Sequence, residues 1–280
     1  LSPILVAPAK GVLFSSYPAT LSSIDDFYVL SNKLAITETT NGIYNSSLYA
    51  AITPQSVLSW VRVVAANRLA TSCINSLLPL PPSPPHFLST NDVQAESWTE
   101  LFAKQNSGTY NNQWVPNYYE THHLTTPSRY CNQIAVDYNL FKPGQPLTDG
   151  LIWIAEQIPG YVYRADVTNY LRVGFWESFN VPFDEYVYNV SGFRALANSF
   201  GNSYTYSMCP RATIFRYENN NNFLYIIKLM ISKTKAGAVE TLDDAMKFIR
   251  YNNWKNDPLS LGDAGNQISA RYDHATGSDK

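Results

Sequence analysis

The side chains that most often carry metal or nucleophilic chemistry are few in this sequence, and they are widely spaced. Its three cysteines are Cys73, Cys131 and Cys209. An odd number excludes a fully paired set of intrachain disulfides. His122 and His123 come nearest to a metal motif, but adjacent side chains point apart on a strand or a helix. No His or Cys group has the spacing of a zinc site. We therefore predict no metal and no cofactor.

Two Asn-x-Ser motifs are typical acceptors of N-linked glycans. They are Asn45-Ser46-Ser47 and Asn189-Val190-Ser191, and they predict glycosylation at Asn45 and Asn189 on a secretory route. No run of about 20 apolar residues occurs, so we expect no transmembrane segment. The net charge of −2 gives no electrostatic reason to expect nucleic acid as a partner.

The elements that must position any site form a mixture of strands and helices. Hydrophobic residues make up 45% of the chain and charged residues 15%, a balance typical of a well-buried globular protein. Because no β-α-β rhythm recurs, the pattern favours an α+β fold over a doubly wound one. Periodicity and turn residues predict strands over 12–17, 27–30, 34–40, 134–141, 151–158 and 212–216, and helices over 54–69, 95–104, 166–173, 190–200 and 241–251.

A polar run from Asn106 to Trp114 carries no charge and almost no aliphatic side chain. It has no apolar face to bury, which excludes a core strand or an amphipathic helix. Asn, Ser and Gly favour turns and hydrogen bonds from side chain to backbone. The run therefore predicts a rigid polar loop beside a sheet, and a plain surface turn is the alternative.

Three stretches break the periodicity of the chain. They cover about 73–93, which is rich in proline, 115–133, and 219–232, which begins with four asparagines. We interpret them as insertions or retained introns within a single domain over 1–280. A weaker alternative for residues 78–85 is a proline-rich ligand of an SH3-type domain.

Eleven short motifs, in order and spanning nearly the whole chain, resemble the phospholipase B-like family, with wording closest to its second, lysosomal branch. They are Phe14-Ser-Ser-Tyr-Pro18, Asp25-Asp-Phe-Tyr28, Glu38-Thr-Thr40, Asn106 to Trp114, Glu156-Gln-Ile-Pro-Gly160, Phe179-Asn-Val-Pro-Phe183, Tyr188-Asn-Val-Ser-Gly192, Pro210-Arg-Ala212, Arg250-Tyr-Asn-Asn253, Asp257-Pro-Leu-Ser260 and Ile268-Ser-Ala-Arg271.

The resemblance implies a fold, a chemistry and three site residues. The fold is the four-layer αββα sandwich of N-terminal-nucleophile hydrolases. The chemistry is acyl transfer on an ester or amide of a phospholipid-type or other acyl substrate, by a Cys that autoprocessing places at a new N-terminus. Asn180 matches the family's oxyanion-hole residue, Arg211 its active-site cation, and Thr40 a residue that hydrogen-bonds near the nucleophile.

The chain departs from the family pattern at its beginning. The family's nucleophilic Cys and the His-[Thr/Asn]-Thr-Trp motif that follows it precede the segment matched by Phe14 to Pro18, and neither is present here. We therefore expect a lysosomal or secreted fragment that is inactive alone and completed by the missing N-terminal part of its own precursor and by further C-terminal strands. The sandwich in this chain is then incomplete. The alternative is a catalytically inactive glycoprotein of the same fold that binds lipid or a partner.

Overall fold

Strand-forming sequence builds one antiparallel sheet in the first half of the protein. The computed structural model describes residues 9–16, 18, 27–70, 94–108, 128–172, 176–216 and 241–274. Its six strands pair antiparallel with their neighbours along the chain, in the order β1-β2-β3-β4-β5-β6. They are β1 Val12–Phe14, β2 Phe27–Leu30, β3 Leu34–Ile43, β4 Ser128–Asp137, β5 Ile152–Ile158 and β6 Tyr161–Asp166.

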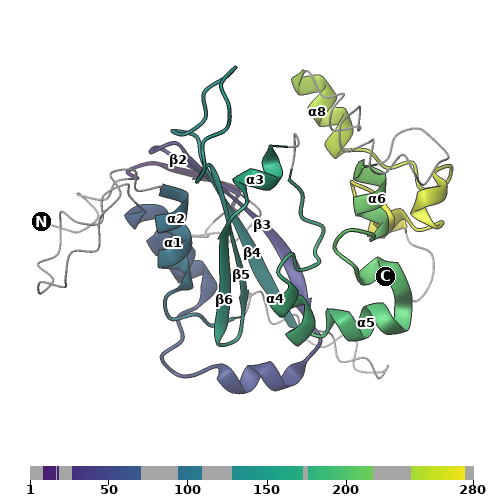
Figure 1. Cartoon of the computed structure of the whole chain (residues 1–280), viewed down its shortest axis with the longest axis horizontal. Coiled ribbons are helices and arrows are strands. Elements are labelled where there is room, and N and C mark those ends of the chain that lie inside the picture. The colour runs from purple at the N-terminus through teal and green to yellow at the C-terminus, as the bar shows by residue number, and fades with distance from the viewer. Residues whose placement is uncertain are drawn as a thin grey trace, which may run out of the picture. The chain divides into compact units, whose positions relative to one another are not determined.

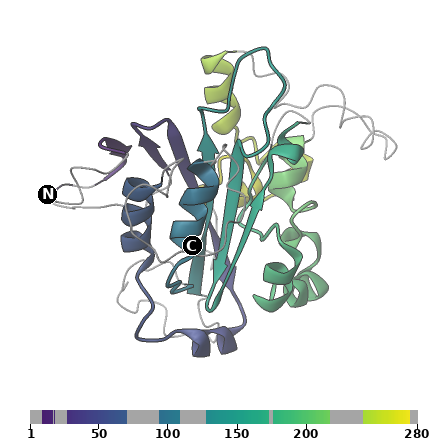
Figure 2. The same ribbon diagram turned by 60° about the vertical axis from the view of Figure 1, so that its left-hand side comes forward.

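Two helices cover one face of this sheet, α1 (Ser59–Leu69) and α2 (Gln94–Ala103). Side chains alternate between the faces of a strand, so Leu34 and Ile36 of β3 point to the same side, and both belong to the buried cluster that includes residues of both helices. Trp98 and Phe102 of α2 are fully buried there, with ring centroids 5.2 Å apart. Figures 1 and 2 show both helices on the same side of the sheet.

The opposite face of the sheet carries a smaller cluster. Ile43 of β3 and Ile158 of β5 pack there with Val187, which belongs to helix α4 (Glu185–Val190). A 3-10 helix, η2 (Ser46–Ala51), follows β3 directly and adds two partly buried side chains, Leu48 and Tyr49. The sheet therefore has protein on both faces, with the larger core under α1 and α2.

The chain divides into two compact units. The first comprises Leu1–Asn169 and Pro182–Gly192, and the second Tyr170–Val181 and Phe193–Lys280. In its described residues the second unit is built from helices and loops. Short helix α3 (Thr168–Leu171) lies where the first unit passes into the second. The remaining elements are α5 Phe193–Phe200, η4 Gly201–Tyr204, α6 Pro210–Arg216, α8 Leu242–Ile249, η6 Pro258–Ser260, η7 Ala264–Asn266 and η8 Tyr272–His274.

The described start of the polar run is a turn that is hydrogen-bonded to the sheet. Asn106 Nδ2 donates to the carbonyls of Ile158, at 2.7 Å, and Tyr161, at 3.1 Å. Asn106 Oδ1 accepts the N–H of Gly108 at 2.6 Å. These bonds tie the turn to the hairpin between β5 and β6. The prediction of a polar loop beside a sheet is confirmed for 106–108, its rigidity stays a prediction, and 109–114 lie outside the described residues.

Several expected elements are confirmed with small shifts of their ends. The strands expected over 27–30, 34–40 and 151–158 are β2, β3 and β5, and the helix expected over 95–104 is α2. The helix expected over 241–251 is α8, and Thr241 caps it in a reciprocal capping box with Asp244. Local signals sufficed for these elements because their periodicity and capping agree with their packing.

One expected strand was wrong, and two expected helices begin later than predicted. The strand expected over 212–216 is helix α6, which has Pro210 at its first position and the backbone bond from Thr213 N to Cys209 O. The helix expected from residue 54 begins at Ser59, because the N–H of Val57 bonds to Gln105 O instead. The helix expected over 190–200 is α5, which begins at Phe193 because Gly192, in a left-handed conformation, separates it from α4.

Two further elements occur where we expected them, but with different bounds. The helix expected over 166–173 is limited in the described residues to α3, and the strand expected from residue 134 begins at Ser128. Residues 128–133, the end of one expected insertion, are therefore part of β4, whereas 73–93, 115–127 and 219–232 lie outside the described residues.

The α+β class is confirmed, since an antiparallel sheet and helices occur together. The four-layer sandwich stays a prediction.

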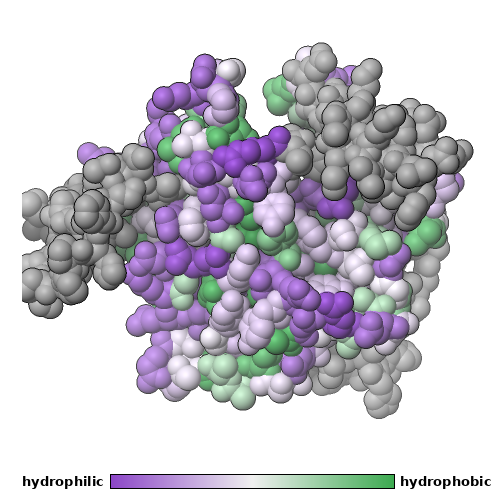
Figure 3. All heavy atoms as spheres, viewed as in Figure 1, coloured by the Kyte–Doolittle hydropathy of each residue, from purple (hydrophilic) through white to green (hydrophobic). Residues whose placement is uncertain are grey.

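On the face that Figure 3 shows, hydrophobic groups of the described residues form small patches among hydrophilic ones, as is ordinary for protein surfaces.

Candidate active site on the Asn180 segment

Asn180 has an unusual backbone conformation. It is exposed and has a φ angle of 63°. This left-handed region is sparsely used by residues other than glycine, although Asn tolerates it better than most. Such conformations cluster at functional sites, where the surrounding structure maintains them.

Arg211 holds the side chain of Asn180. Its Nη1 donates to Asn180 Oδ1 at 2.6 Å. Because a guanidinium only donates hydrogen bonds, the amide atom that faces it is the carbonyl oxygen, and the amide nitrogen lies on the other branch of the side chain. Arg211 therefore fixes the direction of the Asn180 N–H donors.

The guanidinium of Arg211 is itself fixed by the chain near residues 267 and 268. Its Nε donates to Gln267 O at 3.2 Å and its Nη2 to Ile268 O at 3.4 Å. Asn252 supports this loop, because its Nδ2 donates to Ala264 O at 3.0 Å and to Ser269 O at 2.6 Å. The motifs at 250–253 and 268–271 thus position the carbonyls that hold Arg211.

A hydrophobic cluster lies beside the pair of Asn180 and Arg211. Phe179 forms a buried cluster with Cys209 and Ala212, and Phe215 packs against it. The rings of Phe179 and Phe215 meet edge to face, with centroids 5.6 Å apart. The Arg211 Cζ atom lies 6.0 Å from the centroid of the Phe179 ring. The site therefore combines a cation and an oriented amide with two packed aromatic rings.

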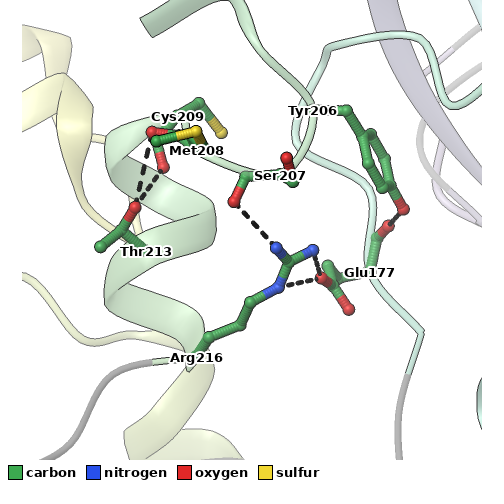
Figure 4. Close-up of polar contacts among 7 residues, drawn as sticks. All are labelled: Glu177, Tyr206, Ser207, Met208, Cys209, Thr213 and Arg216. Atoms are coloured by element: carbon green, nitrogen blue, oxygen red, sulfur yellow. Dashed lines mark hydrogen bonds and ion pairs between the residues drawn. The ribbon is translucent and has the colours of Figure 1, made fainter. Parts of the chain in front are cut away.

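Glu177, on the same segment as Asn180, forms an ion pair with Arg216 of α6, shown in Figure 4. Arg216 Nε donates to Glu177 Oε1 at 2.6 Å, and its Nη2 also contacts that oxygen. The hydroxyl of Tyr206 donates to the backbone carbonyl of Glu177 at 2.5 Å. Burial raises the pKa of the Glu177 carboxyl, and Arg216 offsets part of this effect. Sequence reasoning assigned neither Glu177 nor Arg216 a role.

Thr40 belongs to the first unit and is described separately from Asn180 and Arg211. It is half-buried on β3, and its hydroxyl donates to Glu38 Oε1 at 2.9 Å. The side chains of Thr40 and Glu38 lie on the same face because they are two residues apart on one strand. Glu38 is buried. The structure thus brings Asn180 and Arg211 together and gives Thr40 an acidic partner that the sequence did not predict.

Glu156 is a buried carboxyl that sequence reasoning also missed. Its Oε1 accepts from Asn132 Nδ2 at 2.9 Å and from the N–H of Phe183 at 2.8 Å, and its Oε2 accepts from the N–H of Asp184 at 2.9 Å. These hydrogen bonds lower the pKa of the carboxyl, but burial outweighs them and raises it to about 7. A lone acidic residue within the apolar strand 151–158 was the available signal.

Cys209 is a buried free thiol. Burial is the largest influence on it and raises its pKa, although Arg211 and Arg216 lower it in part. A nucleophilic cysteine needs the opposite shift, so this environment is that of a structural residue. Cys73 and the side chain of Cys131 lie outside the described residues, as do His122 and His123. Within the described part of the chain, no three His, Cys, Asp or Glu side chains gather as a metal site would require.

The two glycosylation motifs differ in accessibility. Asn189 is exposed on α4, and the hydroxyl of Ser191 donates to Val187 O at 2.5 Å. Asn45 is half-buried and caps η2. Its Oδ1 accepts from the hydroxyl of Ser47 at 2.7 Å, and its Nδ2 donates to Val190 O at 3.0 Å. Glycosylation at both positions stays a prediction.

Comparison with known proteins identifies what the chain resembles. A family model described as Phospholipase B matches residues 4–75 and 88–280. Phospholipase B-like protein A of Dictyostelium discoideum is 42% identical over 97% of this chain and 37% of its own length. Phospholipase B-like protein C of the same organism is 39% identical over 98% of this chain and 40% of its own length. Human phospholipase B-like 1 is 36% identical over 93% of this chain and 36% of its own length.

The chain thus spans well under half the length of these relatives. No helix in the described residues is both long enough and apolar enough to cross a membrane.

Proposed function

Because this chain belongs to the phospholipase B family, we propose that it is part of an acyl hydrolase that cleaves an ester or amide bond of a lipid or another acyl substrate. In this proposal the side-chain amide of Asn180 donates to the oxyanion that forms on the substrate carbonyl. Preorganised donors aimed at developing charge are among the strongest contributors to catalysis of acyl transfer.

The hydrogen bond of 2.6 Å from Arg211 Nη1 to Asn180 Oδ1 carries the proposal. It occupies the acceptor end of the amide and so commits the donor end to another direction. Asn180 is exposed, which suits a group that must meet a substrate. The left-handed backbone at Asn180 adds the kind of local strain that functional sites retain.

Arg211 has two roles in this proposal. It orients the Asn180 amide, and its charge attracts a substrate carboxylate or the developing anion, because a guanidinium keeps its charge at every physiological pH. Thr40 supplies a hydroxyl near the nucleophile. The carboxylate of Glu38 accepts the hydrogen bond from that hydroxyl at 2.9 Å, which fixes the direction of the hydroxyl proton.

The nucleophile in this proposal is the N-terminal Cys of an autoprocessed precursor, supplied from outside this chain. Its own α-amino group is the base, since such an amine titrates at about pH 8. Cys209 is unsuited to the task because it is buried and its pKa is raised.

A lysosomal or secreted, glycosylated protein is part of the same proposal. The exposure of Asn189 supports glycan attachment there.

Replacement of Asn180 by glycine in the protein expressed from its complete gene tests the proposal. Glycine adopts the left-handed conformation without strain, so Asn180→Gly removes the side chain and its amide without straining the backbone, whereas Asn180→Ala also strains the backbone. Both variants should lower kcat about a hundredfold or more, as removal of an oxyanion donor does. The assays are hydrolysis of a diacyl phospholipid and of an N-acyl amide, which also separate ester from amide substrates.

Asn202→Ala, at another exposed asparagine of the second unit, is the matched control and should leave turnover unchanged. Unaltered kcat in folded Asn180→Gly would remove Asn180 from the mechanism. A folded wild-type protein that hydrolyses neither substrate would favour the alternative, an inactive binding protein.

A further inference from the structure

The segment from Trp176 to Val181 lies outside helices and strands, so no ladder of backbone hydrogen bonds fixes it. Side chains fix it instead. Arg216 pairs with the Glu177 carboxylate, Arg211 bonds to Asn180 Oδ1, and the Tyr206 hydroxyl bonds to the carbonyl of Glu177. Phe179, between the two bonded residues, is buried against Cys209 and Ala212.

The two arginines lie near opposite ends of one helix. Arg211 is the second residue of α6 and Arg216 is its last. Five residues of helix rise about 7.5 Å, and the three residues from Glu177 to Asn180 span at most about 10 Å. The spacing of the arginines therefore suits the spacing of their partners, and α6 holds the segment at both ends.

The ion pair between Glu177 and Arg216 differs from an ordinary surface pair. The side chain of Glu177 is 9% exposed and that of Arg216 is 32% exposed. Arg216 also donates through Nη1 to Ser207 O at 2.8 Å, as Figure 4 shows. Partly buried pairs with such additional bonds hold their geometry, whereas exposed pairs contribute little.

We propose that Glu177 and Arg216 are positioning residues for Asn180. Their ion pair fixes the beginning of the segment whose end presents the Asn180 amide, so that the amide meets the oxyanion at the required distance. This inference rests on the proposed function, because it assigns Glu177 an effect that passes through Asn180. Displacement of a catalytic group by about 1 Å can cost up to a hundredfold in rate.

The test combines Glu177→Gln and Asn180→Gly, singly and together, in the protein expressed from its complete gene. Glu177→Gln removes the charge and keeps the size of the side chain. Alone, it should lower kcat about tenfold with KM unchanged. Added to Asn180→Gly, it should lower kcat no further, because residues that act through one group are not additive. Asp243→Asn removes the charge of an exposed acidic residue on α8 in the same unit and should change neither constant.

Each result decides between the two proposals. An equal loss of kcat from Glu177→Gln in both backgrounds, or no loss in the wild-type background, overturns the positioning role and leaves the proposed function standing. No effect of Asn180→Gly alone, or no hydrolysis by the wild type, overturns both. If Glu177→Gln does not fold, Tyr206→Phe replaces it, since it removes only the hydroxyl that bonds to the carbonyl of Glu177 and carries the same expectations.

Discussion

Asp184 donates its backbone N–H to Glu156 Oε2 at 2.9 Å, across 28 positions of sequence. The neighbouring N–H of Phe183 bonds to the other oxygen of the same carboxyl. A buried acidic side chain on β5 thereby holds the beginning of α4, whose Val187 packs on the sheet. The contact joins a strand and a helix that local sequence patterns treat as unrelated.

Glu156 should make the stability of the protein depend on pH. Its pKa rises from 4.5 to about 7, first through burial and then through the charge of Asp184. The folded protein therefore holds a proton that the unfolded chain releases between these values. The free energy of unfolding should fall as pH rises through this window, by on the order of 3 kcal/mol. Chemical denaturation at a series of pH values measures it.

Glu156→Gln should flatten this dependence, because glutamine does not titrate. Glu100→Gln is the control, since Glu100 is exposed on α2, where it forms a surface ion pair with Lys104. The same slope in wild type and Glu156→Gln would assign the pH dependence to other groups.

Gly108→Ala should destabilise the first unit strongly. Gly108 has a φ of 65°, and an added Cβ would lie 2.0 Å from the backbone nitrogen of Pro159. Backbone cannot retreat as a flexible side chain can, so the turn must separate from the hairpin. We expect the free energy of unfolding to fall by more than about 3 kcal/mol. The midpoint of urea unfolding measures it.

Gly144→Ala is the matched control for this change. Gly144 also has a positive φ, 75°, but an added Cβ would meet nothing within 4 Å. Gly144→Ala should lower the free energy of unfolding by about 1 kcal/mol, the cost of the conformational strain alone. Equal losses at both glycines would mean that the contact with Pro159 is unimportant.

Arg211→Lys should lower turnover even though it keeps the positive charge. The guanidinium bonds to Asn180 Oδ1, Gln267 O and Ile268 O together, and a single ammonium group does not reproduce this planar arrangement. We expect kcat to fall about tenfold or more as the amide loses its orientation. Arg194→Lys, at an exposed arginine of the same unit, should leave kcat unchanged. Full activity of Arg211→Lys would show that charge alone matters.

The sequence by itself determined the features that depend on neighbours along the chain. The capped helix after Thr241, the alternating strand from Leu34 and the turn at Asn106 follow from capping, periodicity and side chain-to-backbone bonds. The ordered motifs also determined the family, because a series of short matches in register is specific even where each alone is weak. Local patterns do not predict the pairing of Asn180 with Arg211, since nothing local joins positions 31 apart.

Only the tertiary structure decided which residues meet. Thr213, Ile214 and Phe215 favour a strand by propensity, yet they belong to helix α6. Ala212 and Phe215 lie on one face of this helix and cover Phe179. Glu177 and Arg216 meet across 39 positions, as Glu156 and Asp184 meet across 28. Burial of a charged group depends on what folds over it. Its partner and its pKa are therefore properties of the packed chain, and local sequence patterns do not contain them.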